Sequence, residues 1–94
     1  MVWNDNIMQE LLRKKLSYRS KNRGCKETDL LLGNFATKYI NDMTLADLNE
    51  FEIILDQTDS DIVSWVMGRQ EVPSHLQRPM MMKLLSFQTS KFTS

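Results

Sequence analysis

The side chains that most often carry out catalysis are scarce in this chain of 94 residues. His75 is the single histidine, and it lies between Pro73 and Pro79 with no nucleophile signature near it. A catalytic triad needs a histidine base beside its nucleophile, so we interpret His75 as an exposed loop residue. Cys25, the single cysteine, lies among basic residues at an expected helix start, a setting that can favour the thiolate. Because no second cysteine could resolve an oxidised form, we interpret Cys25 as a small structural residue.

Metal-binding and nucleotide-binding patterns also fail for this sequence. Asp56, Asp59 and Asp61 resemble a calcium loop, but the sixth position counted from Asp59 is Ser64 rather than glycine, and the twelfth is Gln70. A single cysteine excludes an internal disulfide and a cysteine-based zinc site. No glycine-rich phosphate loop is present in the sequence. We therefore expect no enzymatic activity, no metal and no cofactor of the protein's own.

The overall composition is typical of one small globular domain. Hydrophobic residues make up 41% of the chain and charged residues 26%. Twelve basic residues balance twelve acidic ones, so the net charge provides no attraction to nucleic acid or to an anionic membrane. No apolar run approaches the roughly 20 residues that a membrane span requires. The first ten residues also lack the patterns of a secretory signal and of a transit peptide.

The charges are unevenly distributed along the chain. Residues 1–26 contain seven basic residues against two acidic ones, whereas residues 27–61 contain nine acidic residues and one basic residue, Lys38. Either the basic first helix packs beside the acidic later ones, or the polarity orients a protein partner. The charge pattern alone favours packing. A small helical nucleic-acid-binding or regulatory adaptor that uses the basic first helix is the alternative function, although the acidic middle of the chain would repel phosphate.

Apolar residues recur at helical spacing almost throughout, and no alternating run of strand length is found. We expect an all-α fold, a compact five-helix bundle over residues 7–88 between tails at 1–6 and 89–94. The first helix is expected at 7–20, capped by Asp5 or Asn6, and the second at 26–40. The third begins after a cap formed by Thr44 and Asp47. The fourth begins at Thr58 or Asp59 and stops at Gly68, and the fifth begins near Arg78. The last start follows from Pro79, which a helix tolerates only in its first turn.

Each expected helix has an apolar stripe that should face the core. In chain order the stripe residues are Ile7, Met8, Leu11, Leu12 and Leu16; Leu31, Leu32, Phe35, Ala36, Tyr39 and Ile40; Leu45, Leu48, Phe51, Ile54 and Leu55; Ile62, Val63, Trp65, Val66 and Met67; and Met80, Met81, Leu84, Leu85 and Phe87. Met82 falls off its stripe. Trp65 should be largely buried, because its helix is too short to be stable alone. Gly33, inside a helix, indicates close approach of a neighbouring helix.

An Arg-Gly-x-x-Glu motif, formed by Arg23, Gly24 and Glu27, leads into the second expected helix. The motif alone is weak, because glycines that stop helices are common. The surrounding pattern is more specific, and it consists of Phe35 and Tyr39, then Leu48, Phe51 and Leu55, then the run Asp-Ser-Asp-Ile-Val-Ser-Trp at 59–65, Gly68 and a proline-containing loop. In order and spacing, residues 10–88 resemble the succinate dehydrogenase assembly factor 2 family of small flavinylation factors.

This resemblance implies a five-helix bundle that acts as an assembly chaperone. Family members bind the flavoprotein subunit of succinate dehydrogenase, or of fumarate reductase, and promote covalent attachment of FAD to a histidine of that subunit. The FAD belongs to the partner, so the resemblance implies no cofactor, no nucleic acid and no membrane span for this chain, which is expected to be a monomer when free. The expected compartment is the cytoplasm of a bacterium, or the mitochondrial matrix if the source is eukaryotic.

The resemblance also implies a partner-binding site. Arg23, Gly24 and Glu27 match the family signature, and other recurring family positions are matched by Asp29, Asp59, Asp61 and Trp65. The sequence departs from the family at Val63, where many relatives have an aromatic residue.

The residue types of the motif suit contact with another protein. The Arg23 fork could hold a partner's carboxylate or carbonyl, Gly24 would permit close approach, and Glu27 could orient Arg23 or accept a cation. We therefore expect Arg23 and Glu27 to reach solvent. In the alternative interpretation, Gly24 only caps a helix, and Arg23 and Glu27 form a surface ion pair of small value.

Overall fold

The computed structural model describes residues 5–92, with the environment of side chains from residue 7 to residue 87. Within this range the chain forms five α-helices and two short 3₁₀ turns. In order these are α1 (Asp5–Lys21), α2 (Lys26–Tyr39), η1 (Ile40–Asp42), α3 (Leu45–Leu55), α4 (Asp59–Val66), η2 (Ser74–Leu76) and α5 (Pro79–Phe92). No strand occurs among the residues described, so the predicted all-α five-helix fold is confirmed.

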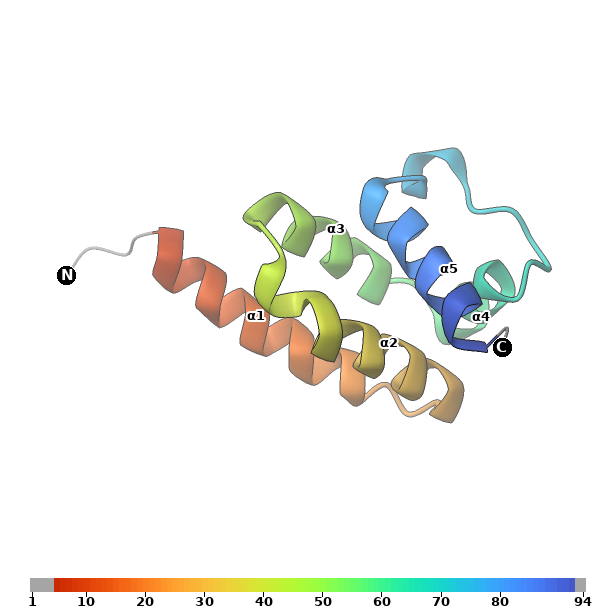
Figure 1. The fold of residues 1–94 in the computed structure, drawn as a ribbon, viewed down its shortest axis with the longest axis horizontal. Coiled ribbons are helices and arrows are strands. Elements are labelled where there is room, and N and C mark those ends of the chain that lie inside the picture. Colours follow the sequence, from red (N-terminus) through yellow and green to blue (C-terminus); the bar gives the residue numbers. More distant parts are fainter. Residues whose placement is uncertain (1–4, 93–94) are drawn as a thin grey trace.

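The helices form a bundle in which α1 and α2 lie side by side and run in opposite directions (Figure 1). Helix α1 also packs against α3, and α5 packs against α3, α4 and α2. The turn between α1 and α2 and the turn between α3 and α4 therefore lie near each other, although they are more than thirty residues apart in sequence. This proximity positions the candidate site.

Local signals set the ends of several helices. Thr44 and Asp47 form a reciprocal capping box, in which the Asp47 N–H donates to Thr44 Oγ1 and the Thr44 N–H donates to Asp47 Oδ2, both at 3.2 Å. Thr58, rather than Asp59, caps α4 by accepting the Asp61 N–H at 3.1 Å. Gly68 ends this region with φ +74°, a conformation that favours glycine. These helix ends agree with the sequence predictions.

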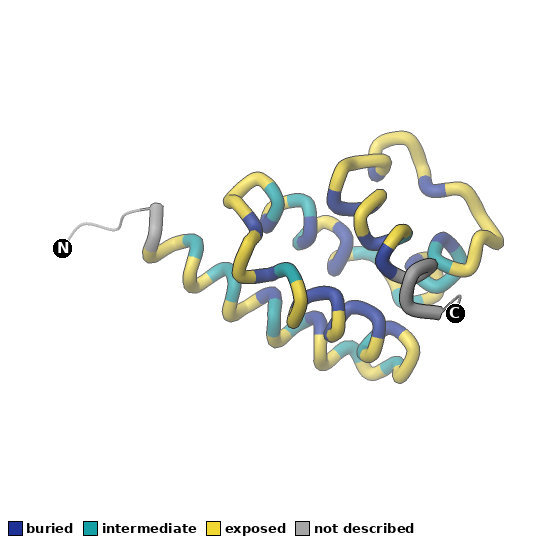
Figure 2. The backbone as a smooth tube through the Cα atoms, viewed as in Figure 1, coloured by how far each residue is buried: buried dark blue, intermediate teal, exposed yellow. Residues whose placement is uncertain are grey.

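The core is built around aromatic rings from different helices. Phe35 on α2 is fully buried, and its ring centroid lies 5.7 Å from that of Phe51 and 5.5 Å from that of Phe87. Trp65 is only 7% exposed, which confirms its predicted burial. Buried positions follow the inner sides of the helices (Figure 2). The predicted stripe residues that are buried are Leu16, Leu31, Leu32, Phe35, Ala36, Ile40, Leu48, Phe51, Ile54, Leu55, Ile62, Trp65, Met80, Met81, Leu84 and Phe87.

Some predicted core residues are exposed instead. Ile7, Met8 and Leu11 are 40%, 53% and 49% exposed, because the first turns of α1 extend beyond the neighbouring helices (Figure 1). Leu45 and Met67, at helix ends, are also exposed, at 40% and 57%. An apolar stripe is buried only where another element covers it, and these predictions are therefore wrong.

The helix limits differ from the expected ones at several points. Helix α1 begins at Asp5, and α5 continues to Phe92 through most of the expected tail at 89–94. Residues 1–4 and 93–94, the outermost parts of the predicted tails, lie outside the described residues. The second helix changes to a 3₁₀ turn at Ile40, and the loop at 69–77 contains η2, whose buried Leu76 joins the core.

Gly33 lies where α2 meets the end of α1, as predicted. A Cβ added at Gly33 would lie 3.3 Å from Lys21 Cγ and 3.9 Å from the Ser20 carbonyl oxygen. The glycine therefore allows the stem of Lys21 to lie against α2.

Candidate partner-binding site

Arg23 joins two turns of the chain that are distant in sequence. Its Nε donates to Asp59 Oδ1 at 2.5 Å, its Nη1 to the Leu55 carbonyl at 2.7 Å, and its Nη2 to the Gln57 carbonyl at 2.6 Å. Its side chain is only 11% exposed. Because the last carbonyls of a helix have no partner within the helix, Arg23 supplies a donor to the Leu55 carbonyl at the end of α3, and a second donor to the Gln57 carbonyl just beyond it.

The expectation that Arg23 reaches solvent is therefore wrong. All three nitrogens of its guanidinium donate to groups of the same chain, so the fork is not open to a partner's carboxylate in this conformation. The expected contact with Glu27 is also absent among the described residues, since the ion pair of Arg23 is made with Asp59. A contribution of Arg23 to partner binding stays a prediction, and it would act by holding the turn in place.

We call the contact of Arg23 with Leu55, Gln57 and Asp59 the junction. Asp59 is its acidic residue. Its Oδ1 accepts from Arg23 and also from the hydroxyl of Thr28 at 2.9 Å, and Thr28 is fully buried. Burial raises the pKa of Asp59, but the hydrogen bonds from Arg23 and Thr28 and the positive charge of Arg23 outweigh burial and hold its pKa below the usual value. Asp59 is therefore ionised near neutral pH, and it ties the turn between α1 and α2, and the first part of α2, to the start of α4.

The exposed part of the motif is the segment from Gly24 to Glu27. Gly24 has φ +89° and open space around the position of a Cβ, as a turn glycine requires. Glu27 is exposed in the first turn of α2, and its Oε2 accepts from the Cys25 thiol at 3.3 Å. Hydrogen bonds from its own backbone N–H and from the thiol lower the pKa of Glu27.

The other predicted site residues occupy three different environments. Asp29 is half-buried, and its Oδ1 accepts the Arg23 backbone N–H at 2.7 Å, which fixes the turn between α1 and α2. Asp61 is exposed in the first turn of α4. Trp65 lies in the core, and Val63 beside it is half-buried. The structure thus brings Arg23, Asp29 and Asp59 together, whereas Trp65 supports α4 from within.

Sequence reasoning missed two residues of the junction. Thr28 is not among the predicted site residues, although its hydroxyl donates to Asp59. Arg19, near the end of α1, donates to the Leu55 carbonyl at 3.1 Å and to Asp56 Oδ1 at 2.8 Å. The available signal for Arg19 was its place in the basic first segment, which was expected to pack beside the acidic middle segment.

The uneven charge pattern is explained by packing between elements. Lys15 pairs with Glu52 at 2.9 Å, Arg19 with Asp56, and Arg23 with Asp59, so bases of the first segment meet acids of the middle segment. This confirms the interpretation that the basic first helix packs beside the acidic elements.

The described residues contain neither a metal-binding cluster nor a membrane-spanning helix. Over the described part of the chain, no group of three or more histidine, cysteine or acidic side chains could hold a metal ion. Among the helices of that same part, none is long and apolar enough to cross a membrane. His75 is exposed in η2, as predicted.

The fold and the junction define a small five-helix protein in which an arginine clamps two turns and leaves a glycine-containing segment exposed. Residues 14–88 match the family described as flavinator of succinate dehydrogenase. The chain therefore belongs to this family, and the resemblance inferred from the sequence is confirmed.

Individual relatives agree with this assignment. The chain is 45% identical over 75 residues to the mitochondrial succinate dehydrogenase assembly factor 2 of Dictyostelium discoideum, an alignment that covers 79% of this chain and 53% of that protein. It is 39% identical over 67 residues to the protein of the same name from Schizosaccharomyces japonicus, covering 71% of this chain and 47% of the relative. It is 33% identical over 84 residues to the FAD assembly factor SdhE of Acetobacter pasteurianus, covering 89% and 75%. The chain spans about half the length of these mitochondrial relatives.

Proposed function

We propose that this protein is an assembly chaperone that binds the flavoprotein subunit of succinate dehydrogenase, or of the related fumarate reductase, and promotes covalent attachment of FAD to it. The observation that carries the proposal is the family match over residues 14–88. The names of the relatives, succinate dehydrogenase assembly factor 2 and FAD assembly factor, support the same function.

The burial of the site residues supports two different roles, contact with the partner and positioning of the contact surface. Gly24, Glu27 and Asp61 are exposed and would contact the partner. Arg23 and Asp59 would act as positioning residues, because their ion pair holds the exposed turn against the start of α4. A rigid contact surface binds with less loss of conformational entropy than a mobile one.

Asp29 and Trp65 would contribute to this site from behind the contact surface. Asp29 fixes the backbone at Arg23, and Trp65 anchors the short helix that presents Asp61. Their substitution would therefore affect partner binding through the fold.

The proposed role is not that of an enzyme. The flavin and the partner's histidine would carry out bond formation, and this chain would hold the partner in a receptive conformation without binding a cofactor of its own. Calorimetric titration of free FAD into the purified protein tests this point. Saturable micromolar binding would contradict it and would indicate a carrier of FAD.

The free protein would be a monomer that works where its partner acquires FAD. That compartment would be the cytoplasm in a bacterium and the mitochondrial matrix in a eukaryote, as the word mitochondrial in the relatives' names supports for eukaryotes.

Co-expression with the flavoprotein subunit tests the main proposal. Covalent flavin is read as fluorescence of the subunit on a denaturing gel, with and without this protein. We expect a clear increase in the flavin signal when the protein is present. An unchanged signal, together with no complex between the two purified proteins, would overturn the proposed function.

A further inference from the structure

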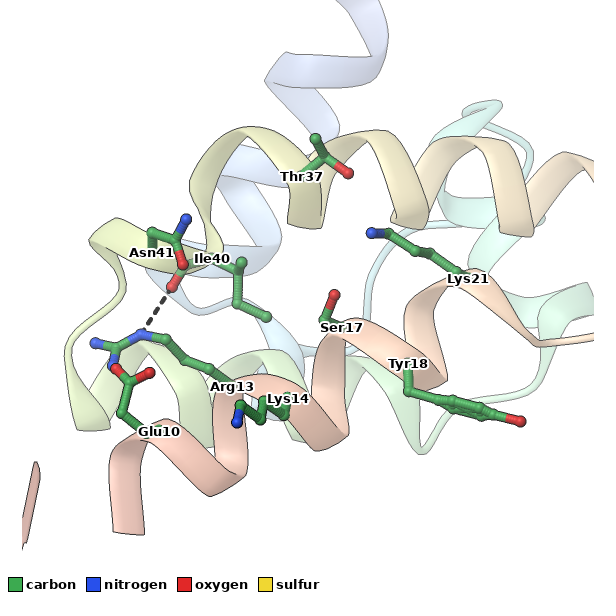
Figure 3. Close-up of a pocket in the computed structure, with 9 residues that line it drawn as sticks. All are labelled: Glu10, Arg13, Lys14, Ser17, Tyr18, Lys21, Thr37, Ile40 and Asn41. Carbon is green, nitrogen blue, oxygen red and sulfur yellow. Dashed lines mark hydrogen bonds and ion pairs between the residues drawn. The ribbon is translucent and has the colours of Figure 1, made fainter. Parts of the chain in front are cut away.

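A groove lies between α1 and the neighbouring α2 and η1. Its volume is about 580 Å³, and it extends from Asn41 in η1 to Lys21, the last residue of α1 (Figure 3). We call it the α1–α2 groove. It lies next to the turn that contains Gly24, and the proposed function does not yet use it.

The α1–α2 groove is rich in hydrogen-bond donors. Lys14 and Lys21 line it, and among the described side chains, those of residues 7–87, neither ammonium group has an ion-pair or hydrogen-bond partner. Figure 3 shows the Lys21 ammonium between the two helices, with the hydroxyls of Ser17 and Thr37 on either side. A surface with these free donors suits an anionic ligand that has many acceptors.

Arg13, at the other end of the groove, differs from the two lysines. Its guanidinium donates to the carbonyls of Ile40 and Met43 and to the carboxylate of Glu10. Arg13 therefore caps the end of α2 and η1, and the free positive charge of the groove comes from Lys14 and Lys21.

Gly33 directs one of these charges into the groove. The Lys21 Cγ lies 3.3 Å from the place where a Cβ of residue 33 would be, so even alanine at this position would require the lysine stem to shift by a few tenths of an ångström. A glycine inside a helix is unfavourable, and here it allows the stem to lie flat so that the ammonium reaches the space between the helices.

The spacing of the two lysines indicates the kind of anion. They are seven residues apart on α1, which is two turns or roughly 10 Å along the helix axis. In an extended segment of polyproline II conformation, which has three residues per turn and a rise of about 3.1 Å per residue, two carboxylates three residues apart lie on the same side and roughly 9 Å apart, close to this spacing.

We propose that the α1–α2 groove receives an acidic, extended segment of the flavoprotein subunit, with one carboxylate on Lys14 and another on Lys21. This rests on the proposed function, since a partner that covers Gly24 would continue over Lys21, three residues earlier in the chain. The hydroxyls of Ser17 and Thr37 would donate to carbonyls of that segment.

Charge reversal tests this proposal. The double variant Lys14→Glu, Lys21→Glu is compared with the wild type and with Arg69→Glu, a control that reverses one exposed positive charge outside the groove. Binding to the purified flavoprotein subunit without covalent FAD is followed at about 0.05 M and about 0.5 M NaCl. We expect association of the double variant to be at least about tenfold slower at low salt, with a smaller difference at high salt, because charges at an interface act mainly on the association rate.

A second double variant separates charge from folding. Lys14→Gln, Lys21→Gln keeps most of both stems, including the part of Lys21 that lies against Gly33. We expect it to retain wild-type helicity and to bind more weakly than Arg69→Glu. If both double variants bind as fast as the wild type, the groove proposal is wrong while the proposed function stands. If the wild type neither binds nor flavinylates the subunit, the proposed function is wrong, and the groove proposal that rests on it is wrong as well.

A nucleic-acid probe gives the competing outcome. A labelled duplex DNA of random sequence is titrated with the wild type at physiological salt. Binding that is lost in the Lys14→Glu, Lys21→Glu variant, while binding to the flavoprotein is unchanged, would make the groove a phosphate-backbone surface and overturn the proposal.

Discussion

Arg23 and Asp59 form an ion pair of 2.5 Å between residues that are 36 positions apart, and this pair holds the turn between α1 and α2 against the start of α4. The arginine belongs to the motif by which the sequence resembles its family, yet its side chain points into its own protein. The exposed surface of the motif is the segment that follows, from Gly24 to Glu27.

Arg23→Ala is expected to destabilise the fold by about 2–4 kcal/mol. The substitution removes three hydrogen bonds from a charged group and leaves the half-buried Asp59 without its cation. Urea unfolding followed by circular dichroism measures the change. Arg23→Lys, which keeps the charge but not the fork, should lose less stability. An unchanged urea midpoint for Arg23→Ala would mean that the hydrogen bonds of the Arg23 side chain do not stabilise the fold.

The Asp59 ion pair should also make stability depend on pH. The pKa of Asp59 is lowered in the folded protein, so its contribution is fully present above the unfolded value of about 3.9 and is lost as the pH falls through the folded pKa. Melting temperatures from pH 7 down to about pH 2 should show a steeper acid limb for the wild type than for Asp59→Asn. Parallel curves for the two proteins would show that ionisation of Asp59 does not contribute to the loss of stability in acid. The effect should be modest, because the Asp59 side chain is 30% exposed.

Glu27→Ala should separate partner binding from stability. Glu27 is exposed, and among the described contacts its side chain accepts only from its own backbone N–H and from the neighbouring Cys25 thiol, so the free energy of unfolding should change little. Covalent flavin on the co-expressed subunit should nevertheless fall. Full flavinylation by this variant would remove Glu27 from the proposed contact surface.

Gly24→Arg should abolish flavinylation while the protein stays folded. The positive φ of Gly24 costs an arginine about 1 kcal/mol or more, but open space surrounds the new side chain, so the loss of function would come from the partner side. Gly68→Arg is the matched control, since Gly68 also has a positive φ and open space but lies after α4. The control should show a similar loss of stability with normal flavinylation. Equal loss of flavin in both variants would indicate a general folding defect.

Trp65→Ala should cost about 3–5 kcal/mol, the usual range for removing a large buried aromatic side chain. Thermal unfolding measures it, and Val63→Ala, at the half-buried neighbour on the same helix, should cost clearly less. A melt unchanged by Trp65→Ala would show that the ring is not part of the core.

Local sequence signals were sufficient for the number of helices and many of their ends. The capping box of Thr44 and Asp47, the stop at Gly68 and the start at Pro79 each depend on residues within one turn of the helix end. Helical periodicity likewise identified most of the core. It could not show that Ile7 and Leu11 are exposed, because a stripe of apolar residues contains no information on where the neighbouring helices end.

The candidate site depended more strongly on tertiary structure. The sequence by itself determined which residues form the motif and that Gly24 could form a turn, since both are properties of a short segment. Only the tertiary structure decided that the Arg23 guanidinium binds Leu55, Gln57 and Asp59 and not a group outside the protein. These partners lie 32 to 36 residues away, and no local spacing rule relates residues at that distance. The packing of α1 against α3 brings them together, and the uncapped carbonyls at the end of α3 then attract the arginine.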